Sequence, residues 1–277
     1  MTKRNRITVT WELMTTSMHL LLADKRILWA PILAVLVSLV LGGIFAVPII
    51  FDLVHWAEQS QMHNTPISLI VMFIVYYVLL YFVSTFTGAM VISHIHRRLS
   101  GQPTSLGLAF SDAWQRIGAL FLWSVLAASI GMLIHNLERS HRSIAAIIAG
   151  LFVGLAWGVI SFFALPIIVI DKVGVFDGIK QAMQVIRQQW GGMVLGMGMV
   201  GLFFLLLTLL GIGVLVATVK YSHSIELTLI VSVLAILYIV AVGIIRATIY
   251  MVFRTVLLHY AKTGSMPTGI SQSVLRT

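Results

Sequence analysis

Six long apolar stretches constrain the fold of this chain more than any other feature. Each is long enough to cross a hydrocarbon core of about 30 Å, which takes about 20 helical residues. Because lipid offers no hydrogen-bond partners to backbone groups, stretches of this length must be helical. The sequence therefore predicts an all-α, polytopic membrane helix bundle with six transmembrane helices. These are expected at residues 27–51, 67–93, 117–134, 144–170, 192–219 and 227–246.

Composition excludes a soluble domain. Hydrophobic residues make up 59% of the chain and charged residues 10%, whereas a soluble domain is about 25% charged. Such a chain cannot cover its own surface with polar groups. Cysteine is absent, which rules out disulfides and thiol chemistry. We expect one membrane domain over residues 1–277, without a cofactor.

The distribution of Lys and Arg predicts the orientation. Thirteen of these cations flank the spans on one side and three on the other, with Arg246 and Arg254 in or near the last span. Since cytoplasmic connections carry the excess of cations, both termini are predicted to be cytoplasmic. Most of the net charge of +9 then lies beside the anionic inner leaflet, where it sets the orientation of the spans. We expect no nucleic-acid partner.

An amphipathic interfacial helix is predicted before each pair of spans. The layout gives three units, 7–93, 104–170 and 175–258, followed by a cytoplasmic tail at 259–277. Apolar side chains recur at helical spacing in each interfacial segment. The three stripes are Ile7, Trp11, Met14, Met18 and Leu22; Leu106, Phe110, Ala113, Trp114 and Ile117; and Phe176, Ile179, Met183, Ile186 and Trp190.

Small residues indicate where helices pack closely. Gly150, Gly154 and Gly158 recur every four positions in the fourth span, and Gly192 and Gly196 begin the fifth. In lipid, such a seam lets a neighbouring helix approach because packing drives association. The neighbour could belong to this chain, which we favour, or to a second protomer. A homo-oligomer and a membrane partner protein both stay open.

The last span carries the candidate binding residues. Arg246, Tyr250 and Arg254 follow one another at intervals of four residues, which places them on one helical face. Arg246 lies about twenty residues beyond the start of the span, so its side chain can snorkel to the inner interface. If Arg246 instead faces the bundle interior, these residues form a candidate site for an anion or a lipid headgroup.

The sequence does not favour a metal site. Asp52, His55, Glu58 and His63 lie in the first outer connection, where solvated polar residues are ordinary. The two histidines of the second span, His94 and His96, are two positions apart, and such a pair points to nearly opposite sides of a helix. We read both as interfacial residues and expect no metal.

Part of the chain resembles a known family. The resemblance rests on RRLSGQPTSLGLAFSDAWQRIGALFLW, on LAWGVISFFALPIIVIDKVGVFDGIKQAMQVIRQQWGG and on LLHYAKTG. These segments resemble an uncharacterised bacterial family of six-span integral membrane proteins of unknown function. That family is distantly similar to the membrane domain of some glycerophosphodiester phosphodiesterases. Asp171 departs from the pattern, which has glutamate there. The resemblance implies a multi-pass protein of the bacterial cytoplasmic (inner) membrane and no established activity.

The sequence leaves three classes of function. We expect no enzyme, because no span carries paired acids and no nucleophile elbow, phosphate loop or HExxH helix occurs. A transporter or channel usually has intramembrane charges or broken helices. Apart from Arg246, the spans contain almost no ionisable groups. We favour a non-catalytic protein that organises lipids, especially anionic inner-leaflet lipids, or partner proteins. The alternative is a transporter or channel for a small or lipid-like, anionic solute.

Single-cysteine labelling tests this topology. In the cysteine-free chain, Ser60→Cys should react with an impermeant maleimide on spheroplasts, because its connection is predicted to lie outside. Ser100→Cys, in a predicted inner turn, should react only after the membrane is opened. The opposite pattern would invert the predicted orientation.

Overall fold

The structure is a computed structural model that describes residues 6–58, 67–139, 144–222 and 224–264. The described residues are helical apart from short turns, and they contain no strand. In chain order the segments are α1 Arg6–Ala23, η1 Lys25–Leu28, α2 Trp29–Glu58, α3 Ile67–Leu99, α4 Leu106–Trp114, α5 Ile117–Arg139, α6 Ile144–Ile170, α7 Val175–Tyr221 and α8 Ile225–Thr263. Six of the described helices are long and apolar enough to cross a membrane. The predicted fold class is confirmed.

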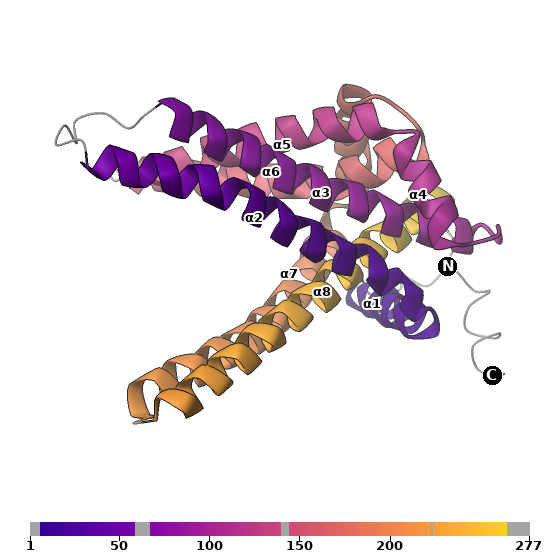
Figure 1. Cartoon of the computed structure of the whole chain (residues 1–277). Helices are drawn as coiled ribbons and strands as arrows, with labels where there is room; N and C mark the ends of the chain where they lie inside the picture. The colour runs from indigo at the N-terminus through magenta and orange to yellow at the C-terminus, as the bar shows by residue number, and fades with distance from the viewer. Residues whose placement is uncertain (1–5, 59–66, 140–143, 223, 265–277) are drawn as a thin grey trace.

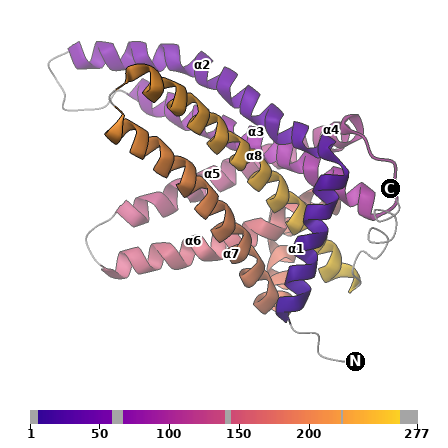
Figure 2. The same ribbon diagram turned by 90° about the horizontal axis from the view of Figure 1, so that it is seen from below.

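The long helices form three hairpins that fan out from one end of the molecule. α2 pairs with α3, α5 with α6, and α7 with α8, and the ends of α2, α5 and α7 lie at the far end of the hairpins (Figures 1 and 2). At the near end the last turn of α3 meets α4 and the last turn of α8 meets the turn 171–174, and we call this region the joined end. The start of α1 and the end of α8 both lie on this side (Figure 2).

The packed core lies near the joined end. Its buried side chains come mainly from the last third of α3, from Phe162 to Val169 of α6 and from Val252 to Leu258 of α8. Phe162 packs against Phe253 with ring centroids 6.1 Å apart. Farther from this end the hairpins diverge and expose apolar side chains such as Leu39 and Val47. Apolar surface of this kind is the surface that acyl chains cover in a bilayer.

Several helices extend beyond their predicted ends, and α7 and α8 differ most from the prediction. The third amphipathic segment and the fifth span are one helix, α7, of 47 residues. The Gly191–Gly192 pair weakens a helix but keeps both N–H donors, so it does not end the helix as proline would. α8 continues beyond residue 246 to Thr263, where Gly264 adopts a left-handed φ of 66° and its N–H bonds to the carbonyl of Tyr260.

The glycine seam of α6 lies only partly against a neighbour. A Cβ on Gly154 would lie 3.6 Å from Cγ2 of Ile134 in α5, whereas at Gly158 no described side chain comes within 4 Å. Gly150 is buried. The surroundings of Gly192 and Gly196 lie outside the described residues.

Among the described glycines, Gly211 of α7 has the least room for a side chain against its own hairpin partner. A Cβ there would lie 2.7 Å from Cδ1 of Tyr238 in α8. The Tyr238 hydroxyl donates a hydrogen bond of 3.1 Å to the carbonyl of Leu207. The absence of a side chain at Gly211 thus lets the Tyr238 ring cross to α7 and bond to its backbone.

Alanine substitutions two residues apart test this contact. Gly211→Ala should lower the free energy of unfolding by about 1–3 kcal/mol, because the new methyl group overlaps a rigid ring. Gly213→Ala, where nothing described lies within 4 Å, should raise it by up to about 1 kcal/mol through helix propensity. Thermal unfolding in detergent measures both, and equal effects would contradict the packing.

Candidate functional site

The joined end holds a set of ion pairs that connect different helices. Asp24, in the turn between α1 and η1, lies 2.9 Å from Nε2 of His94 and 3.6 Å from Nη1 of Arg98, both on α3. Its other oxygen accepts a hydrogen bond from the backbone N–H of Arg26. One carboxylate thus fixes the start of the first hairpin against the end of α3.

A second carboxylate fixes α4 to α3. Arg97 donates two hydrogen bonds to Asp112, from Nε at 2.7 Å and from an Nη at 2.8 Å, and the Ser93 hydroxyl bonds to the same carboxylate. The guanidinium bonds, assisted by Ser93 and by the nearby charge of Lys172, lower the pKa of Asp112 below its ordinary value. This pair is a charge-assisted, bidentate contact of the strong kind.

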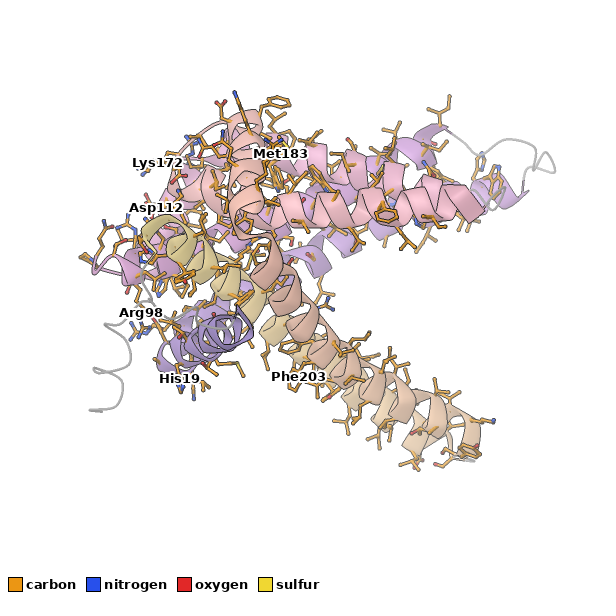
Figure 3. The ribbon with its side chains drawn as sticks, turned by 180° about the vertical axis from the view of Figure 1, so that it is seen from behind. His19, Arg98, Asp112, Lys172, Met183 and Phe203 are labelled. Atoms are coloured by element: carbon orange, nitrogen blue, oxygen red, sulfur yellow. The ribbon has the colours of Figure 1, made fainter. Side chains whose placement is uncertain are left out.

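The turn between α6 and α7 is fixed from two sides. Lys262 of α8 forms an ion pair with Asp171, and an Nη of Arg116 donates hydrogen bonds to the carbonyls of Val173 at 2.5 Å and Ile168 at 3.4 Å. Between this turn, α3 and α4 lies a polar cavity of about 190 Å³. Its polar lining includes Ser93, His96, Arg97, Asp112, Arg116 and Lys172. Figure 3 shows Asp112 and Lys172 at this end.

Arg254 is a buried cation in the core. Its side chain is only 5% exposed, and among the described residues no carboxylate lies within ion-pair distance of it. One Nη contacts the sulfur of Met251, and the buried Nε has no hydrogen-bond partner. Gly88 of α3 makes room for this group, because a Cβ there would lie 2.9 Å from Met251 Cε and 3.5 Å from Arg254 Nη2.

An apolar cavity of about 270 Å³ adjoins this buried cation. It lies between α2, α3 and α8, and both Gly88 and Met251 line it. The hydroxyls of two lining threonines, Thr87 and Thr248, already bond to carbonyls of their own helices. The remaining surface is mostly apolar. Met251 therefore lies between this apolar cavity and the Arg254 guanidinium.

The three predicted binding residues have different surroundings. Arg246 is exposed, Tyr250 packs its ring on Phe162 at 5.2 Å, and Arg254 is buried. Eight residues at about 100° each leave Arg246 and Arg254 about 80° apart around the helix. Arg246 also lies where α8 leaves the core, so the structure does not bring these two cations together.

Two other sequence interpretations concern histidine. His94, read as interfacial, is 2% exposed and pairs with Asp24, while His96 lines the polar cavity. The sequence could not reveal the Asp24–His94 contact, since 70 positions separate the two residues. Of the residues predicted for the first outer connection, Asp52, His55 and Glu58 lie instead in α2, and His63 lies outside the described part. No three His, Asp or Glu side chains cluster in the described ranges to hold a metal.

Comparison with known proteins places the chain in a family. A family model matches residues 66–268, which include α3 to α8 and therefore the polar cavity and Arg254. The chain belongs to DUF6159, a family of unknown function. No curated protein was found to be similar to the chain. The family match does not show the similarity to glycerophosphodiester phosphodiesterases, and that similarity stays an expectation.

Acid unfolding tests the Arg97–Asp112 pair. Because the pKa of Asp112 is lowered on folding, the pair stabilises the protein fully above the unfolded value of about 4, and this stability is lost as the pH falls through the folded pKa. Asp112→Asn should therefore be less stable at pH 7 by about 1 kcal/mol, as expected for a partly exposed pair. Its melting temperature should also fall less below pH 4.

Asp177→Asn, which changes an exposed acid in α7, is the matched control and should keep the acid transition of the wild type. Melting temperatures across pH 3 to 7 give the comparison. Superimposable curves for wild type and Asp112→Asn would exclude the pair as a source of acid sensitivity.

Proposed function

We propose that this DUF6159 protein is a non-catalytic membrane protein that binds anionic phospholipid of the inner leaflet, between α2, α3 and α8. The observation that carries the proposal is the burial of Arg254 without a described carboxylate partner. By holding lipid at this position, the protein would organise the leaflet around its three hairpins. No hydrolysis of the lipid is proposed.

The charge of Arg254 supports an anionic ligand. A buried, unpaired charge lowers the stability of the fold by several kcal/mol, because no counter-charge offsets the loss of its hydration. A guanidinium has five N–H donors in a planar arrangement that matches phosphate oxygens. Only one described side-chain contact, to the weak acceptor sulfur of Met251, involves these donors. A lipid phosphate would supply both the charge and the acceptors.

The apolar cavity supports a lipid over a soluble anion. Along α8, the cavity residues Val240 to Thr248 precede Met251 and Arg254, so the apolar surface leads toward the cation at the joined end. With this end cytoplasmic, as the sequence predicts, an inner-leaflet lipid would have the same polarity. Its acyl chain would follow the cavity and its phosphate would approach Arg254. Methionine is unbranched and flexible, so Met251 can move aside.

Native mass spectrometry after mixing with phosphatidylglycerol and phosphatidylcholine tests the proposal. Wild-type protein should retain phosphatidylglycerol, and Arg254→Met should retain at least about tenfold less, equivalent to about 1.4 kcal/mol. In lipid-free detergent the same variant should be more stable by about 1–4 kcal/mol, as found when apolar groups replace buried charges. Arg246→Met removes an exposed cation from the same helix and should change neither result.

Met251→Ala sharpens the test. Shortening this side chain should connect the cavity with the guanidinium and increase retention of phosphatidylglycerol. Equal retention by wild type and Arg254→Met would exclude Arg254 as the site. A lipid-scrambling assay in vesicles separates holding from transport, because transmembrane movement of the lipid that depends on Arg254 would favour the transporter alternative.

A further inference from the structure

We propose that the polar cavity at the joined end is a second site, which binds a phosphate group at the membrane surface. This site is separate from Arg254 and does not depend on the lipid proposal above. The ligand chemistry is that of a phosphate with free oxygens, carried either by inorganic phosphate or by the headgroup of a phosphatidic acid. Three observations support this site: uncompensated positive charge in the cavity lining, an unbonded N–H donor of Arg116 and the left-handed backbone of Lys172.

The charges that line the cavity leave an excess of cation. Asp112 is the carboxylate in the lining, and Arg97 and Ser93 already bond to it. Arg116 and Lys172 also line the cavity, and within the described ranges no carboxylate lies at ion-pair distance from either. Two positive charges are therefore not compensated there, which favours an anion carrying up to two negative charges.

Backbone contacts hold Arg116 in place beside the cavity. Backbone carbonyls of Ile168 and Val173 accept from one of its Nη atoms, which fixes the guanidinium but leaves its charge unneutralised. Its Nε atom is buried and makes no hydrogen bond. A buried donor without an acceptor costs free energy, and a phosphate oxygen in the cavity would supply that acceptor.

Lys172 occupies a position that normally favours glycine. Its φ of 56° is left-handed, and it follows the end of α6 at Ile170. Helices commonly end with glycine in this conformation, since a Cβ there is strained. This chain has a lysine at that position, with its side chain in the lining of the cavity. The backbone strain is small. Compared with glycine, the lysine adds a positive charge at the cavity.

The size of the cavity fits a small ligand. At about 190 Å³ it is smaller than the roughly 300–1,000 Å³ of pockets for drug-sized molecules. A phosphate group with a small substituent matches this volume better than a nucleotide. The Asp112 carboxylate lies in the same lining, and its engagement by Arg97 limits the repulsion that a phosphate would meet.

Lys172→Gly separates binding from folding. This change removes the cation and also relieves the left-handed strain, so the variant should melt at the same or a higher temperature than the wild type. Its affinity for inorganic phosphate should fall at least about tenfold. The probe is inorganic phosphate titrated into the full chain in phosphatidylcholine nanodiscs, followed by calorimetry at constant ionic strength. Lys180→Ala removes an exposed cation of α7 and should bind phosphate as the wild type does.

The outcomes distinguish the sources of the phosphate. Saturable binding of inorganic phosphate that is lost in Lys172→Gly supports a soluble ligand. Binding only to nanodiscs that contain phosphatidic acid, with the same dependence on Lys172, supports a lipid headgroup. Equal affinities of wild type and Lys172→Gly in both arms would overturn the site. Arg254→Met should bind inorganic phosphate normally, so failure of the lipid proposal would leave this result unchanged.

Discussion

Close packing of the last third of α3 against α6 and α8 holds the three hairpins together. In lipid the apolar surface of a helix gains little by leaving the surrounding acyl chains, so association depends on side-chain fit. Residues from Ala89 to Ile95 are buried at this crossing, and Gly88 lets Met251 of α8 approach without a clash. Away from it the hairpins separate (Figures 1 and 2).

The ion pairs of the joined end extend this packing to the polar side. Asp24, Asp112 and Asp171 each form an ion pair with a cation of another helix. Asp112 and Asp171 lie in connections between spans, and Asp24 lies just before the first span. The carboxylates are partly shielded, which makes their pairs stronger than ordinary surface pairs. Since the chain has 18 Lys and Arg against 9 Asp and Glu, these pairs cannot compensate every cation.

The described cations that have no carboxylate partner differ in their surroundings. Arg254 is enclosed by the core beside an apolar cavity, a setting that suits a ligand with both a charge and an acyl chain. Arg116 and Lys172 line a polar cavity at the end of the bundle, where a small, hydrated anion can enter. Exposed cations such as Arg246 need no partner other than water or lipid headgroups.

The sequence by itself determined that the chain is a helical membrane protein, because stretches of about 20 apolar residues have only helices as a backbone solution in lipid. It also named Arg254 among the candidates, from helical spacing alone. It did not predict that α7 is continuous through Gly191–Gly192, since two glycines weaken a helix without deciding its end.

Only the tertiary structure decided which cation is buried and which basic side chain pairs with each carboxylate. Arg246 and Arg254 look alike in the sequence, and their surroundings differ because α8 leaves the core between them. Asp24 and His94 are 70 positions apart, so no local pattern could pair them. Contacts of this kind depend on how helices cross, and crossing is set by the fit of many side chains at once.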